Sequence, residues 1–280
     1  MLIITYIPRI SILMHISKSQ YKGGGVINLK NKLKKNELTI GSWITLAHTA
    51  IAEIMAGAGF DWLAIDMEHS AITLKEAQQL IQVIGLCGIP ALVRVEENNP
   101  VIIKRVMDAG AHGVIVPMVN SKKLAEQAVS SVKYPPYGRR GVGLARAQGY
   151  GLNFENYKKW NNVSSVVIAQ IEHSDAIESL EDILSVEGID GSIIGPYDLS
   201  ASLGYPGNFC HPSMKEALKQ YSFICKKLKK PMGVHVIPPE INELRKAVER
   251  GYKFIARSLD TLFLAHSCRE GLKSLKPKRK

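Results

Sequence analysis

The chain has 280 residues, of which 46% are hydrophobic, so it can bury one large core and has the usual size of a single-domain α/β barrel. Its net charge of +11 arises at the ends: residues 1–35 and 271–280 hold twelve basic and no acidic residues, and residues 36–270 are nearly neutral. A neutral body argues against an extended nucleic-acid-binding surface, and no run of about 18 apolar residues is present to cross a membrane.

Residues 1–28 have two open explanations. They form an N-terminal extension, or the start is mis-assigned and Val26 is the first residue, since Lys22-Gly23-Gly24 can be encoded by a purine-rich ribosome-binding site. Residues 29–272 are expected to form one catalytic domain, followed by a basic tail at 273–280. Four scattered cysteines without metal-ligand spacing are typical of reduced thiols and favour a cytoplasmic protein.

From residue 29 onward, short apolar runs alternate with amphipathic stretches. Eight strands are expected, at Thr39–Leu46, Trp62–Asp66, Ala91–Val95, Gly113–Pro117, Val166–Ile171, Gly191–Ile194, Met232–Val236 and Phe254–Arg257. Helices are expected between most of them, at Ala50–Ala58, Leu74–Ile84, Val101–Ala109, Lys122–Lys133, Ser174–Leu184, Ser213–Leu228 and Pro239–Arg250. Strands that are apolar throughout indicate a parallel sheet covered on both faces. The pattern predicts a closed (β/α)8 TIM barrel, with a doubly wound open sheet as the alternative.

Two carboxylates follow neighbouring strands of the predicted barrel. Glu172 comes directly after Val166–Ile171, and Asp198 lies four residues beyond Gly191–Ile194. Active sites of such barrels form where the strands end, so both side chains are expected at the same rim. Carboxylate oxygens, completed by water and substrate, suit Mg²⁺, Mn²⁺ or Co²⁺. The sequence therefore predicts a divalent metal site.

Further polar residues follow other strands: Asp66, His69, Arg94, Gln170 and Tyr197. Each has a structural alternative, since His69 could cap a helix and Arg94 could form an ion pair. Their convergence on one rim favours an active site. His235 and Arg257, at the ends of the seventh and eighth strands, are additional candidates for substrate contact.

Several long segments resemble the HpcH/HpaI aldolase family, in the right order: Phe60–His69, Val116–Val119, Tyr134–Gly143, Gln170–Glu172 and Gly191–Gly204. This family includes 4-hydroxy-2-oxoheptanedioate aldolase and 2-dehydro-3-deoxyglucarate aldolase. The resemblance implies a metal-dependent class II pyruvate aldolase, a carbon–carbon lyase that cleaves a 4-hydroxy-2-oxo acid to pyruvate and an aldehyde through a metal-stabilised enolate. A citramalyl- or malyl-CoA lyase is the alternative, although the compact chain has no evident basic pocket for CoA.

The resemblance also implies roles for individual residues. Glu172 and Asp198 would bind the metal, and Gln170 with the backbone at Tyr197 and Asp198 would hold the 2-oxo acid. His69 would be the general base, and Arg94 would stabilise the enolate oxygen.

The partner of His69 stays open. Asp108 matches the family residue that raises the basicity of this histidine, but its place near a helix end puts it toward the opposite rim. Position in the chain favours Asp66 instead, three residues before His69. Tyr197 stands where the family often has a small residue, so the aldehyde is not specified.

The resemblance further implies a homo-oligomer, commonly a hexamer with exchanged C-terminal helices. The apolar stretch Leu259–Cys268 is a candidate for that packing. The expected partner is a small-molecule 2-oxo acid, with no nucleic acid and no membrane.

Overall fold

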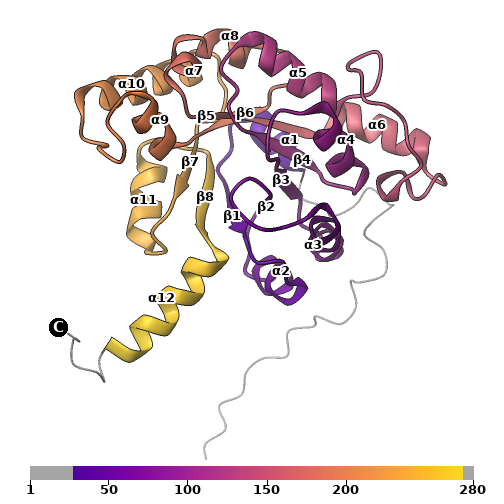
Figure 1. Cartoon of the computed structure of the whole chain (residues 1–280), viewed down its shortest axis with the longest axis horizontal. Helices are drawn as coiled ribbons and strands as arrows, with labels where there is room; N and C mark the ends of the chain where they lie inside the picture. Colours follow the sequence, from indigo (N-terminus) through magenta and orange to yellow (C-terminus); the bar gives the residue numbers. More distant parts are fainter. Residues whose placement is uncertain (1–27, 274–280) are drawn as a thin grey trace, which may run out of the picture.

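The computed structural model describes residues 28–273, in which eight parallel strands close into a barrel in the order of the chain (Figure 1). The strands are β1 (Thr39–Ile44), β2 (Trp62–Asp66), β3 (Ala91–Arg94), β4 (Gly113–Val116), β5 (Val166–Ile171), β6 (Gly191–Ile194), β7 (Gly233–Val236) and β8 (Phe254–Leu259). The predicted TIM barrel is confirmed, and the open sheet is wrong because β1 pairs with β8. The predictions for the N-terminal extension and the basic tail lie outside the described residues, apart from residues 28 and 273.

Helices lie between the strands and around the barrel: α1 (Leu29–Lys34), α2 (Thr49–Ala56), α3 (Leu74–Leu86), α4 (Pro100–Asp108), α5 (Lys122–Val132), α6 (Phe154–Ser164), α7 (Ser174–Glu178), α8 (Leu180–Ser185), α9 (Pro196–Ser202), α10 (Pro212–Lys227), α11 (Ile241–Glu249) and α12 (Asp260–Lys273). The predicted helix Ser174–Leu184 is two helices, α7 and α8, which meet at Ser179. Helices α1, α6 and α9 were not predicted. Within residues 28–273, no helix is both long and apolar enough to span a membrane.

Capping residues explain where helices α3 and α4 begin, after the loops that follow β2 and β3. Thr73 and Glu76 form a capping box at the start of α3, each side chain bonding the backbone N–H of the other. Asn99 caps α4 ahead of Pro100, whose missing N–H costs nothing in the first turn. The loops that carry Glu68, His69 and Glu96 are thus fixed at their far ends.

Aromatic side chains fill the barrel interior. Trp62 stacks on Phe254 with ring centroids 4.2 Å apart, and Trp43 belongs to the same buried cluster. Gly41 is required for this packing, because a Cβ there would come within 2.1 Å of the Trp62 ring. The interior is therefore a packed core and not a channel. The carboxyl-terminal end of the barrel strands, above this core, is called the mouth.

Helix α1 closes the amino-terminal end of the barrel. Leu29 and Leu33 belong to the interior cluster, and Lys30 Nζ lies 2.8 Å from a carboxylate oxygen of Asp190, just before β6. The carboxyl-terminal end of the strands is left as the entrance for a ligand.

Candidate active site

Asp66 and Arg94 form a bidentate ion pair at the ends of β2 and β3. Arg94 Nε lies 2.9 Å from Asp66 Oδ1, and Nη2 lies 2.6 Å from Oδ2. The guanidinium also lies over the Trp43 ring, 4.4 Å from its centroid. Burial alone would lower the pKa of Arg94, but the hydrogen bond and charge of Asp66, with those of nearby glutamates, raise it. Arg94 is therefore a fixed, permanently charged group at the mouth.

Glu68 joins this pair to Gln170 on β5. Its Oε2 lies 3.3 Å from Arg94 Nε and accepts a hydrogen bond from Gln170 Nε2 at 3.3 Å. Burial raises the pKa of Glu68, with Arg94 opposing and Glu172 adding to the rise. Sequence analysis gave Glu68 no role, although it lies within the segment from Asp66 to His69.

Glu172 is buried and held from two sides. Its Oε1 accepts the backbone N–H of Met118 at 2.7 Å, and its Oε2 accepts Gln170 Nε2 at 2.5 Å. Met118 has φ +52°, in the left-handed region that non-glycine residues seldom adopt. Such a conformation persists only when its surroundings enforce it, and here it directs an N–H at the carboxylate.

Glu172 and Asp198 both approach Gly195, the residue before α9. A Cβ built on Gly195 would lie 3.0 Å from Glu172 Cβ, 3.2 Å from Glu172 Oε2 and 3.8 Å from Asp198 Oδ2. Glycine thus allows both carboxylate side chains to approach the same point of the backbone. The two do not form a closed cage, since residues 28–273 contain no group of three or more His, Cys, Asp or Glu side chains able to hold a metal.

The charges at the mouth are unbalanced. Asp66, Glu68, Glu172 and Asp198 are four carboxylates, and Arg94 is the one guanidinium among them. Carboxylates in excess of cationic side chains suit a hard divalent cation that keeps positions for water and substrate. The residues therefore fit the predicted metal site.

His69 lies at the edge of this cluster with its side chain 63% exposed. Its Nε2 is 3.9 Å from Glu68 Oε2, whereas Asp66 binds only its backbone, accepting the N–H of His69 at 3.2 Å. Asp66 therefore shapes the turn that carries His69 and does not pair with the imidazole.

Asp108 is bound elsewhere. Its Oδ1 accepts Arg140 Nη2 at 2.5 Å and Gln148 Nε2 at 3.3 Å. It ends α4, which leads to the start of β4 and so to the rim opposite the mouth. Within one chain the structure does not bring Asp108 to His69.

The remaining candidates fall on different sides of the barrel wall. Tyr197 lies in the first turn of α9 beside Asp198, is 54% exposed, and meets the Phe209 ring edge-on. His235 lies inside the mouth, with its ring 5.8 Å from that of Trp43. Arg257 points outward, donating to the carbonyl of Pro239 at 3.0 Å, so its predicted place among the substrate contacts is wrong.

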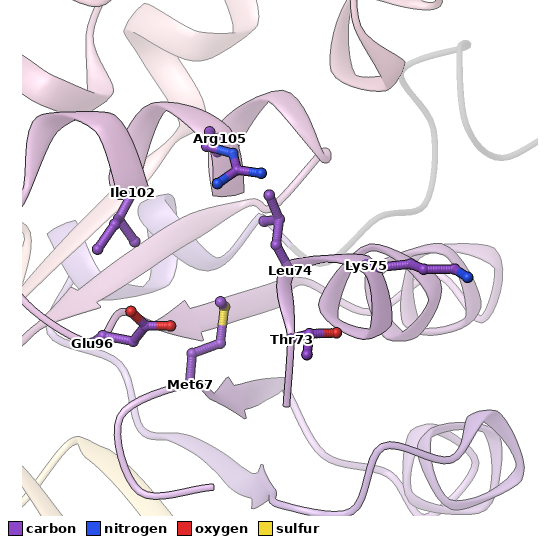
Figure 2. Close-up of a pocket in the computed structure, with 7 residues that line it drawn as sticks. All are labelled: Met67, Thr73, Leu74, Lys75, Glu96, Ile102 and Arg105. Carbon is purple, nitrogen blue, oxygen red and sulfur yellow. The ribbon is translucent and has the colours of Figure 1, made fainter. Parts of the chain in front are cut away.

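A cavity of about 460 Å³ lies just outside the mouth, between α3 and α4 (Figure 2). Its lining residues are Met67, Thr73, Leu74, Lys75, Glu96, Ile102 and Arg105. Met67 packs into the outer core, because successive side chains of β2 alternate and Asp66 points inward. This cavity contains none of the predicted site residues, so it is separate from the carboxylate cluster.

Comparison with known proteins gives a consistent result. The profile of the HpcH/HpaI aldolase/citrate lyase family matches residues 39–267. The chain is 36% identical to 2-keto-3-deoxy-L-rhamnonate aldolase of Escherichia coli (strain K12), over 88% of this chain and 92% of that one. Its structure is similar to an HpcH/HpaI aldolase/citrate lyase family protein from Burkholderia cenocepacia J2315 (TM-score 0.84, 31% identity, 89% and 99% coverage). It is also similar to an HpcH/HpaI aldolase from Desulfitobacterium hafniense DCB-2 (TM-score 0.80, 31% identity, 90% and 98% coverage).

Proposed function

Because this chain belongs to the HpcH/HpaI aldolase/citrate lyase family, we propose that it is a metal-dependent pyruvate aldolase that cleaves a 4-hydroxy-2-oxo acid to pyruvate and an aldehyde. The observation that carries this proposal is the approach of Glu172 and Asp198 to the same point at Gly195, with Glu172 linked through Gln170 to Arg94. The relative named for 2-keto-3-deoxy-L-rhamnonate supports a deoxy sugar acid as the kind of substrate.

Glu172 and Asp198 are the residues that would hold the divalent cation, with Gln170 beside them to orient the 2-oxo acid. When bound, Mg²⁺, Mn²⁺ or Co²⁺ supplies positive charge at the keto oxygen of the substrate. Gln170 is suited to its role because Glu172 and Glu68 both accept from its amide nitrogen and leave its position fixed. The backbone at Tyr197 and Asp198 would contact the 2-oxo acid from the other side.

Arg94 would stabilise the enolate oxygen of the product half. Cleavage of the C3–C4 bond leaves an electron pair on C3, which delocalises onto the keto oxygen. Asp66 holds the guanidinium rigid, so this charge meets a preorganised cation that needs no reorganisation. A preorganised group of this kind contributes more in a water-poor site than it would in bulk solvent.

His69 would take the proton of the 4-hydroxyl group as the aldehyde forms. An imidazole can accept and return a proton, and this one is exposed at the mouth, where a substrate or an intervening water reaches it. The resemblance gives it Asp108 as a partner, and that pairing would require Asp108 of a second copy. None of the eight strands described ends in lysine, so a Schiff base with the substrate has no candidate residue at the strand ends.

The test is pyruvate release from a panel of 4-hydroxy-2-oxo acids by protein stripped of metal with EDTA, then resupplied with Mg²⁺, Mn²⁺ or Co²⁺. We expect turnover to disappear with EDTA and return with metal. Undiminished turnover in EDTA would refute metal dependence. Cleavage of citramalyl- or malyl-CoA, without cleavage of any free hydroxy-oxo acid, would establish the CoA lyase alternative.

We also propose that the chain forms a homo-oligomer, a hexamer by resemblance, in which α12 packs on another copy. The helix projects from the barrel (Figure 1), and Asp260 is its one buried residue. Asp260 fixes its root by accepting the N–H groups of Thr45 and Leu46, both at 2.8 Å. Beyond it, Leu264 is 56% exposed. Light scattering of the full chain tests this, and a monomer at micromolar concentration would contradict it.

A further inference from the structure

Three neighbouring strands carry polar atoms without partners across the mouth from Glu172. Trp43 is the next-to-last residue of β1, His235 lies on β7 and Ser258 lies on β8, and the closed order of the barrel makes these strands adjacent. The indole Nε1 of Trp43 and the Oγ of Ser258 are buried without a hydrogen-bond partner among residues 28–273. We call Trp43, His235 and Ser258 the β7–β8–β1 patch.

The tautomer of His235 follows from its contacts. Its Nε2 lies 3.2 Å from the carbonyl oxygen of Ser258, which can only accept, so Nε2 carries the hydrogen. Burial lowers the pKa of His235 to about 4, the Ser258 bond opposing and Arg94 adding to the fall, so the ring is neutral near pH 7. Its Nδ1 is then a lone-pair acceptor, without a partner among the described residues.

The patch adjoins the place where the reacting half of the substrate would lie. Arg94 spans the two regions: its guanidinium lies 4.4 Å from the centroid of the Trp43 ring, and its Nη1 lies 3.4 Å from Gln170 Oε1. Because Arg94 contacts both Gln170 and the Trp43 ring, a substrate held by Gln170 and Arg94 would border the β7–β8–β1 patch. Buried polar atoms left unpaired are costly, and a ligand that satisfies them gains that energy.

We propose that His235, with Trp43 and Ser258, selects substrates whose aldehyde half carries a hydroxyl group. A hydroxyl can donate to Nδ1 of His235 while accepting from the Trp43 N–H or the Ser258 hydroxyl. An alkyl group would leave these atoms unpaired, and a carboxylate has no hydrogen to give to Nδ1. The inference rests on the proposed aldolase function and narrows its substrate class to hydroxylated chains, such as deoxy sugar acids.

The experiment uses the reverse, carbon–carbon bond-forming reaction with pyruvate, Mn²⁺ and one of two aldehydes that differ by a single hydroxyl, glycolaldehyde and acetaldehyde. The measured quantity is the ratio of kcat/KM for glycolaldehyde to that for acetaldehyde. His235→Leu should lower this ratio roughly tenfold to a hundredfold, because intrinsic aldehyde reactivity cancels between wild type and variant. His235→Asn, which keeps an acceptor near the position of Nδ1, should restore part of it.

His112→Leu is the matched control. His112 is equally buried, with its pKa lowered to about 4 mainly by burial, but its Nδ1 accepts the N–H of Ala91 at the opposite end of the barrel. The ratio of the two kcat/KM values for His112→Leu should equal the ratio for wild type. An unchanged ratio in folded His235→Leu, or equal ratios for the Leu and Asn variants at position 235, would overturn the inference.

A separate measurement distinguishes this failure from failure of the aldolase proposal. Exchange of the pyruvate methyl hydrogens with D₂O, followed by NMR, requires enolisation but no aldehyde. Exchange by wild type with an unaltered ratio in His235→Leu refutes only the role of His235. No metal-dependent exchange and no condensation by wild type refutes the proposed function itself.

Discussion

The two ends of the barrel use charge in opposite ways. At the amino-terminal end, Lys30 meets Asp190 at 2.8 Å, and Lys133 Nζ lies near four oxygens, of Asn161, Asn162 and Ser165, at 2.6 to 3.4 Å. These cations are buried and fully engaged. At the carboxyl-terminal end, Asp66 and Glu68 pair with the one guanidinium of Arg94, and two further carboxylates, Glu172 and Asp198, approach Gly195.

The difference separates structural charge from functional charge. A buried cation surrounded by carbonyl oxygens has no capacity left for a ligand, so it can only hold elements together. A cluster with more carboxylates than cationic side chains has acceptor oxygens with which to bind a cation. If this contrast is correct, substitutions at the mouth should alter binding and activity more than stability, and those at the closed end the reverse.

The largest effect is expected from Glu172→Gln. Glutamine keeps the volume of the side chain but removes the charge, so we expect Mn²⁺ binding to disappear and pyruvate release to fall by about a thousandfold or more. Binding is measured by calorimetry and activity by coupled assay. Glu181→Gln, which affects a half-exposed carboxylate on α8 paired with Lys227, is the control and should change neither. Retained Mn²⁺ affinity in Glu172→Gln would contradict the conclusion that the carboxylates at the mouth bind a metal.

Gly195→Ala tests the position of the metal site by adding a single methyl group. The residue has φ −97°, so alanine fits its backbone, but the new Cβ would lie 3.0 Å from Glu172 Cβ and near both carboxylates. We expect Mn²⁺ affinity to weaken roughly tenfold with little change in Tm. Gly57→Ala is the control, because a Cβ there meets nothing closer than 3.6 Å. Unchanged affinity would mean that the metal does not bind between Glu172 and Asp198 beside Gly195.

Strand positions and residue types were enough to predict the acidic side of the mouth. An acid directly after a buried apolar run, as at Glu172, must lie at the rim of a parallel barrel, whatever its neighbours are. The same reasoning placed Arg94 and His235 correctly. It placed Arg257 wrongly because strand alternation was not applied: Phe254 and Ala256 face inward, so Arg257 faces out.

Other features had no signal in side-chain identity. The backbone N–H of Met118 holds Glu172 through a left-handed conformation that a methionine does not indicate. Asp108 meets Arg140 across 32 residues of chain, through an irregular loop whose course no periodicity predicts. Helix α6 was not predicted because its sequence is polar apart from a few aromatic residues. Contacts made by backbone atoms or across long loops require the folded structure.

The last prediction concerns stability alone, at the closed end, and uses Lys133→Met. Burial, and then the nearby charge of Lys30, lower the pKa of Lys133 from 10.5 to about 7. Between these values the unfolded chain binds more protons than the folded one, so this group makes stability rise with pH over that window. In urea unfolding at pH 7.5 and 9.5, wild type should gain roughly 1 to 2 kcal/mol relative to Lys133→Met. Lys158→Met, at a half-exposed site, should show no such gain. Equal pH dependence in wild type and Lys133→Met would show that burial does not lower the pKa of Lys133. The contrast between the two ends of the barrel would then be supported only by the variants at the mouth.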